Sequence, residues 1–401
     1  MRESLRAEVA KVKAAHHPPA SSDDGQQDGN SITDAEARAR DITEISYLGI
    51  LADSYFSVRL ARQLHNLGDA GPYVAHIMTP WWSLYIHELR PGSTSADLLT
   101  ELSPEAAEAL ERSRHGLKMF LDTKRDIHAC EDYFEAIEHA HRQRFTGQVT
   151  PLLRGLTRDL GITTYRHTNV STSHGVAFAT GLEPTAVLSD EMGPRLGRLW
   201  NEAGGAFAMA ALATDGPRPA VLDTWDPALF KQHDKKSTRF YSTIFTGRGH
   251  PHLNAVLLHY LGMVNAANML LPVVFDVNGD QYALFKIRYL LTSHVLGSLK
   301  RLSSDPRDLD SKSATHLRHL VEDIPSPVST SRPWFRNLLV HYEPNSKTDV
   351  SLFNPQHLLA GLAKIAEVPE DVNDLLAGVN SNLEHLASGL EAWMNAGARA
   401  A

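Results

Sequence analysis

Apolar residues recur every three to four positions through most of this chain, the spacing that gathers them on one face of an α-helix. The longest such pattern runs from Ile42 to Ala61, and Thr33 with Glu36 forms a capping box before it. We therefore expect a mostly helical protein. Further patterns of this kind predict helices at residues 103–122, 126–145, 194–213, 253–271, 281–302, 312–323, 333–342, 355–367 and 369–396.

Two changes in composition divide the chain into regions. Residues 16–32 hold too few apolar groups to offset the entropy lost on ordering, so we expect a disordered tail over residues 1–32. A connection rich in Gly and Pro at residues 214–227 predicts a boundary further along. The regions that follow are a mostly helical one, 33–225, and a helical domain, 226–401.

The helical pattern is interrupted within the first of these regions. Thr, Tyr, Val and Phe alternate there with Gly and Ser, which predicts short strands at residues 162–167, 176–180 and 186–188. His174 follows Ser171 and Ser173 and would suit a hydrolase. No glycine-flanked nucleophile turn or acidic partner accompanies these residues, so we interpret residues 161–188 as a small β-containing insert.

Composition narrows the classes of function. The 401 residues carry a net charge of −8, which disfavours general coating of polyanions, so any contact with nucleic acid needs a local basic patch. Cys130 is the only cysteine, which excludes intrachain disulfides and zinc sites with several thiolates. No apolar run reaches 18 residues, and the N-terminus lacks the apolar core of a signal peptide. We expect a cytoplasmic protein without membrane contact.

The predicted helix at residues 333–342 has unusual polar residues. Pro333 suits its first position, and Pro344 ends it. Its sequence is mostly apolar, yet it carries Arg336, Asn337 and His341. Asn337 and His341 lie one turn apart on the same face, and the long side chain of Arg336 reaches toward that face near the helix N-terminus, where an anion is favoured.

An arginine and asparagine followed by three apolar residues and a histidine resembles the motif of the HEPN superfamily, an arginine and a histidine separated by four to six residues. The resemblance covers about residues 250–400, all predicted to be helical, and places the motif helix late in a bundle, as in that family. The segment from Phe285 to His294 also resembles what precedes the motif helix in HEPN-type proteins. The expected fold is therefore a HEPN-like helical bundle in the C-terminal half, beside the helical N-terminal region and the β-containing insert.

The resemblance implies an endoribonuclease that needs no metal or cofactor. The ribose 2′-OH attacks the adjacent phosphorus while a base accepts its proton and an acid protonates the leaving 5′-oxygen. His341 is then the candidate acid and base, because histidine titrates near physiological pH. Arg336 would bind the phosphate, and Asn337 would orient His341 or the scissile phosphate. In bacteria, a toxin or defence role suits such an enzyme.

The same resemblance implies a homodimer. One histidine cannot readily act as acid and base at once, which gives a physical reason for the symmetric dimers of the family, in which two motif helices form one composite site. We expect the contact through residues 333–342. His294 borders the apolar stripe of its helix and is a candidate to line the cleft that His341 faces, with Arg288 on the same helix as a candidate RNA contact.

A second region also suits RNA. Residues 231–252 are the most basic stretch of an acidic chain, and cations interleaved with aromatic rings are what binding of single-stranded RNA requires. A solvated loop with its aromatic side chains turned inside is the competing interpretation. The candidate RNA contacts here are Lys235, Lys236, Arg239 and Arg248, beside Phe240, Tyr241 and Phe245.

Two further functions compete with a nuclease. In the first, Arg336 and His341 are structural, and the chain is a HEPN-like module that binds RNA or nucleotides, or a scaffold, without catalysis. In the second, Glu135, Glu138, His139 and His141 bind metal in an oxidoreductase, since Glu-x-x-His is the spacing of carboxylate-bridged di-iron bundles. That site needs a second Glu-x-x-His, which the chain lacks, so a solvated helix face is the simpler interpretation.

Overall fold

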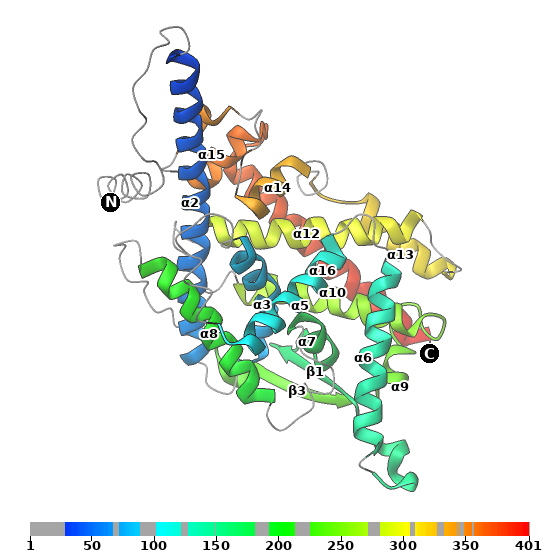
Figure 1. The fold of residues 1–401 in the computed structure, drawn as a ribbon. Coiled ribbons are helices and arrows are strands. Elements are labelled where there is room, and N and C mark those ends of the chain that lie inside the picture. Colours follow the sequence, from blue (N-terminus) through cyan, green and yellow to red (C-terminus); the bar gives the residue numbers. More distant parts are fainter. Residues whose placement is uncertain are drawn as a thin grey trace.

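The computed structural model describes residues 29–66, 72–88, 102–121, 127–147, 149–180, 192–212, 225–271, 281–304, 309–326, 333–342, 344, 349–354 and 357–400. Most of these residues are helical, as predicted (Figure 1). None of the helices among them is long and apolar enough to cross a membrane.

Most of the helices follow the apolar patterns, and side chains cap the N-terminal ends of some of them. Ser103 Oγ accepts from the backbone N–H of Ala106 at the start of α5, and Asp310 accepts from Lys312 and Ser313 at the start of α13. The helices are α2 (Gly29–Asn66), α3 (Pro72–Glu88), α5 (Pro104–Leu121), α6 (Ile127–Gly147), α7 (Ser173–Thr180), α8 (Met192–Leu212), α9 (Ser237–Tyr241), α10 (Pro251–Met269), α12 (Gln281–Ser304), α13 (Ser311–Glu322), α14 (Pro333–His341), α15 (Leu358–Ile365) and α16 (Val372–Ala400). Short 3-10 turns are η2 (Pro151–Leu156), η4 (Pro227–Leu229) and η6 (Val350–Leu352).

The start of α2 differs from the prediction. The helix begins at Gly29, four residues before Thr33, so the predicted capping box lies inside it and residues 29–32 of the predicted tail are helical. Residues 1–28 lie outside the described part of the chain. The misplacement has a simple reason, since Thr and Glu spaced as in a capping box also occur within helices, where propensity and packing decide.

A small three-stranded antiparallel sheet is present, in the order β2-β1-β3, but only its first two strands lie at the predicted insert, and of these only β1 was predicted as a strand. Strand β1 (Leu160–Tyr165) pairs with β2 (Thr168–Thr172) and with β3 (Phe230–Lys235). The strand predicted at residues 176–180 is wrong, because those residues belong to α7. Thr172 Oγ1 accepts from the backbone N–H of Gly175 at 2.9 Å and starts the helix, a local cap that outweighs the β-propensity of the segment. The strand predicted at residues 186–188 lies outside the described residues.

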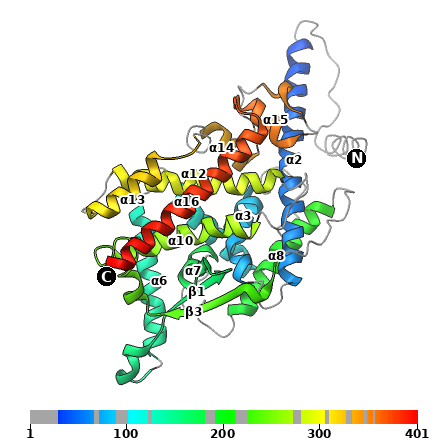
Figure 2. The ribbon, with the colours of Figure 1, turned by 180° about the vertical axis from the view of Figure 1, so that it is seen from behind.

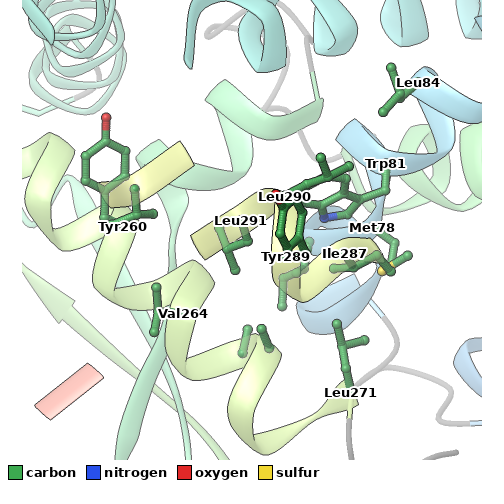
Figure 3. Packing of buried hydrophobic residues seen from close by; sticks show 14 of the residues in the cluster. Met78, Trp81, Leu84, Tyr260, Val264, Leu271, Ile287, Tyr289, Leu290 and Leu291 are labelled. Carbon is green, nitrogen blue, oxygen red and sulfur yellow. The ribbon is translucent and has the colours of Figure 1, made fainter. Parts of the chain in front are cut away.

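Helices α3, α10 and α12 meet at the centre of the core. Helix α10 is buried on nearly all sides, as is most of α12, which is typical of helices without a polar face. Figure 3 shows Trp81 of α3, Val264 of α10 and Leu290 of α12 in this packing.

Elements from both sides of the predicted boundary near residue 225 share this core. Helix α2 packs against α8 and also against α12, and strand β3 completes a sheet whose other strands precede it by more than fifty residues. Figure 2 shows α16 crossing the body of the molecule diagonally beside α10, with the sheet below them. The two predicted regions are therefore joined by backbone hydrogen bonds as well as by side chains.

Candidate active site

Helix α14 spans Pro333–His341, as the sequence predicted, and it has one buried and one solvent-facing side. Phe335, Leu338 and Leu339 are buried, and the ring of Phe335 lies 5.3 Å from that of Tyr289 on α12. The helix also packs against α3 and α15. Its polar residues are therefore left on the outer side.

Two of the three motif residues lie on that outer side, and the third reaches it with its guanidinium. Asn337 and His341 are exposed and Arg336 is half-buried. A guanidinium N–H of Arg336 donates to Asn337 Oδ1 at 3.3 Å. Because arginine has five N–H donors, this bond leaves donors for an anion. The arrangement combines a cation, an amide and an imidazole on one accessible face.

The end of α14 is anchored directly after His341. Tyr342 has a φ of +56° and donates its backbone N–H to Leu338 O at 3.0 Å. Its carbonyl accepts from Ser46 Oγ on α2 at 2.9 Å. Its ring packs where Gly49 lacks a side chain, because a Cβ there would come within 2.5 Å of a ring carbon. Helix α2 therefore fixes the position of the motif helix.

A buried ion pair lies under this anchor. Lys286 Nζ on α12 is 2.7 Å from Asp53 Oδ2 on α2, and both side chains are fully buried. The hydroxyl of Tyr342 donates to the same carboxylate oxygen, and Lys286 Nζ lies 3.9 Å from the centre of the Tyr342 ring. Burial raises the pKa of Asp53, whereas Lys286 and Tyr342 act in the opposite direction. This network joins α2, α12 and the end of α14.

The sequence held a signal for Lys286 that was missed. It lies four residues from both Tyr282 and Leu290, so the period of the helix places it on the buried side. Its partner Asp53 lies 233 residues away in the sequence, and nothing in the spacing of the chain links the two.

His294 and Arg288, the candidate cleft residues of α12, make internal contacts. His294 is buried and lines an internal cavity of about 40 Å³ together with His76 and His259. Burial, aided by Arg301 and Arg336, lowers the pKa of His294 to about 3, so its ring is neutral at physiological pH. Arg288 donates to the side chain of Asn380 and to Ala267 O, ties that connect α12 to α16 and α10.

The basic stretch at residues 231–252 forms strand β3, helix α9 and the loop before α10. Lys235, Lys236, Arg239 and Arg248 are exposed, but Tyr241 and Phe245 are buried. These rings cannot stack on bases, which favours the interpretation with aromatic side chains turned inside. Helix α9 lies well apart from α14 (Figure 1).

Arg248 lines a groove with a volume of about 450 Å³. Lys312 and His316, one turn apart on α13, line it as well. The predicted site residues therefore fall in three places, namely the outer face of α14, the interior beneath α12, and the surface around β3 and this groove.

The residues proposed as metal ligands on α6 divide between two faces. Glu138 and His141 are buried, while Glu135 and His139 are exposed. Within the described ranges, no group of three or more His, Cys, Asp or Glu side chains is arranged to hold a metal ion. The imidazole of His139 instead lies 2.7 Å from Gln143 Nε2 on the same helix.

A buried polar cluster surrounds Glu138 instead. Ser237 Oγ lies 3.0 Å from Glu138 Oε1 and 2.7 Å from Asp159 Oδ2, and it has one proton to donate. The hydroxyl of Tyr241 lies 2.9 Å from Nδ1 of His174. Burial, aided by His141, lowers the pKa of His174 to about 3. Sequence reasoning missed this cluster because its members come from three helices, α6, α7 and α9, and from the segment before β1.

The cluster reaches the surface at His252. Its Nε2 lies 3.2 Å from Glu138 Oε2, and its Nδ1 lies 3.6 Å from Glu135, so it bridges α10 and α6. The hydrogen bond with Glu138 raises the pKa of His252. Burial acts to raise the pKa of Glu138, but the bonds with His252 and Ser237 outweigh it and hold that pKa below its ordinary value.

This bridge predicts a pH-dependent contribution to stability. The stability that His252 contributes is fully present below its ordinary pKa of 6.5. It is lost as the pH rises through the higher pKa of His252 in the folded state. The stability that Glu138 contributes is fully present above its ordinary pKa of 4.5 and is lost as the pH falls through its lower pKa in the folded state. We expect His252→Gln to lower the free energy of unfolding by about 0.5 kcal/mol more at about pH 5.5 than at about pH 8.5.

Urea unfolding at the two pH values measures this difference. His357→Gln, which removes an exposed histidine on another part of the surface, is the control and is expected to show no such difference. An equal cost of His252→Gln at both pH values would show that the bridge does not titrate.

Comparison of the chain with protein-family models, with curated proteins and with solved structures finds no match in any of the three. The function of this protein is therefore inferred from the positions and chemistry of its own residues.

Proposed function

We propose that the outer face of α14 is half of the active site of a metal-independent endoribonuclease of the HEPN type, completed by a second copy of the chain. One observation carries the proposal. Asn337 and His341 face outward from a helix whose other side is buried and whose end is anchored to α2, and the guanidinium of the half-buried Arg336 bonds to Asn337. A cation, an amide and an imidazole are thereby held together at the surface, and these are the groups that the cleavage requires.

Each residue has a role in the cleavage. The guanidinium of Arg336 binds the scissile phosphate and stabilises the charge that develops on its oxygens. A base accepts the proton of the ribose 2′-OH as that oxygen forms a bond to phosphorus. The bond from phosphorus to the 5′-oxygen breaks, and an acid gives that oxygen a proton. His341 serves as one of these two groups, and Asn337 orients it or the phosphate.

The second proton-transfer group comes from the partner in this proposal. A symmetric pair of α14 helices, meeting through residues 333–342, brings two histidines and two arginines to one place. The outward position of the motif residues permits this contact. An enzyme of this kind would cut cellular RNA in the cytoplasm. This activity suits a toxin or a defence effector.

The test is cleavage of a labelled, unstructured RNA in the presence of EDTA, with analysis of the product ends. We expect products with a 2′,3′-cyclic phosphate and a 5′-hydroxyl, and no cleavage by the double variant Arg336→Ala/His341→Ala. The matched control is Arg318→Ala/His357→Ala, which removes an exposed arginine and an exposed histidine elsewhere and is expected to cleave normally. Cleavage that requires a divalent metal would contradict the proposal.

The exposed cations around β3 favour a second candidate function, RNA binding without cleavage. Lys235, Lys236, Arg239 and Arg248 are available to phosphates, although the rings of Tyr241 and Phe245 are buried and that of Phe240 is half-buried. A gel-shift assay separates the two functions. Binding that is lost in Lys235→Gln/Lys236→Gln/Arg239→Gln, together with no cleavage by the wild type under any condition, would favour the binding module.

A further inference from the structure

The C-terminal end of α6 and the turn η2 project from the body of the protein. We call the described residues 142–147 and 149–158, which lie between the buried part of α6 and strand β1, the projecting tip. In Figures 1 and 2 it extends below the sheet and the helices, so most of it has no neighbouring element.

The projecting tip gathers exposed apolar side chains. The exposed fractions are 95% for Leu152, 76% for Leu156, 50% for Leu153 and 36% for Phe145. These are four of the five large hydrophobic side chains that are exposed in the described part of the chain, and only Leu352 lies elsewhere. Single exposed leucines are ordinary on a protein surface, but a concentration at a protruding point marks an interaction site.

The same tip is basic. Arg144, Arg154 and Arg158 are exposed, and within the described residues their side chains make no hydrogen bond or ion pair. Arg142, at the base, lies 3.7 Å from Glu138. The tip contains no Asp or Glu, in a chain whose net charge is −8. A positive, apolar point on an acidic protein selects an anionic partner.

The chemistry favours a lipid surface over nucleic acid as that partner. Leucine has no flat face on which a base could stack. Nucleic-acid phosphates would bind the arginines but would leave the four apolar side chains exposed to water. Segments that lie in the membrane interface combine these two features, since apolar side chains enter the boundary of headgroups and acyl chains while arginines contact anionic headgroups.

We propose that the projecting tip docks the protein on an anionic lipid surface, with Leu152, Leu153 and Leu156 in the interface and Arg144, Arg154 and Arg158 on lipid phosphates. The contact is peripheral, and it revises the expectation of no membrane contact. It does not depend on the activity of α14, which lies on another part of the molecule.

Flotation of the full-length protein with lipid vesicles tests the proposal. We expect it to bind phosphatidylcholine vesicles that contain phosphatidylserine, and to bind pure phosphatidylcholine vesicles at least about fivefold less well, the effect of a single arginine at an anionic surface. Leu152→Ser/Leu156→Ser and Arg144→Gln/Arg154→Gln/Arg158→Gln should each weaken binding by at least about tenfold. Because the mutated side chains are exposed, both variants should fold.

Matched controls separate docking from general surface effects. Leu352→Ser removes the exposed leucine outside the tip and Arg318→Gln removes an exposed arginine on α13, and both are expected to bind vesicles as the wild type does. Arg336→Ala/His341→Ala should also bind normally, so this test is independent of nuclease activity.

Two results would overturn the proposal. One is a lack of the expected lipid binding, seen either as wild-type protein that does not float with phosphatidylserine vesicles or as tip variants that float as well as the wild type. The other is a wild-type dimer that becomes monomeric in Leu152→Ser/Leu156→Ser without any lipid binding, which would assign the tip to contact between copies of the chain.

Discussion

Replacing Lys286 by methionine is expected to lower the free energy of unfolding by about 3–5 kcal/mol, the cost of breaking a buried ion pair by removing one partner. Methionine fills the space of the lysine stem but leaves the Asp53 carboxylate buried without its cation. The Tyr342 hydroxyl remains as a donor to Asp53, yet one neutral hydrogen bond offsets little of the cost of burying a charge. Urea unfolding followed by circular dichroism measures the change.

The dependence of this cost on pH identifies its cause. Without Lys286, the folded-state pKa of Asp53 lies further above its unfolded value, so its contribution to stability is greatest at low pH and is lost as the pH rises. The cost of Lys286→Met should therefore shrink as the pH falls toward about 5. Asp53→Asn/Lys286→Met should recover part of the lost stability, because no charge remains buried. A cost that is independent of pH and is not relieved in the double variant would point to lost packing instead.

His341→Ala is expected to lower the rate of RNA cleavage by at least about 100-fold, the ordinary contribution of a general acid or base. Because His341 is exposed, the free energy of unfolding should change by less than about 0.5 kcal/mol. His357→Ala, another exposed histidine, is the control and should change neither quantity. A loss of several kcal/mol of stability in His341→Ala would instead assign the residue a structural role.

Mixing two inactive chains tests whether the site is composite. In a heterodimer of Arg336→Ala and His341→Ala chains, the shared site holds one intact arginine and one intact histidine. Co-expression with two different affinity tags isolates this species, and it should cleave faster than either homodimer. Activity no higher than that of the homodimers, with the heterodimer confirmed by both tags, would contradict a site that one arginine and one histidine from different copies can form.

The regular elements were largely predictable because they depend on local spacing. The apolar period and the prolines on either side fixed the extent of α14, and its polar residues could be assigned to one face in advance. The prediction failed where a single hydrogen bond decided between two local structures. The cap that Thr172 provides made α7 a helix, although its composition favoured a strand.

The structure divides the candidate site residues into buried and exposed ones, a division that their spacing in the sequence did not predict. His294 was expected to line the cleft that His341 faces, but His294 is inside the molecule and His341 is on its surface. Likewise, Tyr241 and Phe245 stand among cations in the sequence, and yet their rings pack in the core. Which neighbours cover a side chain depends on segments far away in the chain.

The sequence by itself determined most of the helices, the overall charge and the motif of α14, since each of these follows from the residues of the chain without long-range contacts. Only the tertiary structure decided that Lys286 pairs with Asp53 under the end of α14, and that Leu152 and Leu156 stand exposed on a basic tip. The physical reason is the same in both cases. The environment of a charge or of an apolar side chain is set by what packs against it, and that depends on contacts between distant segments rather than on local pattern.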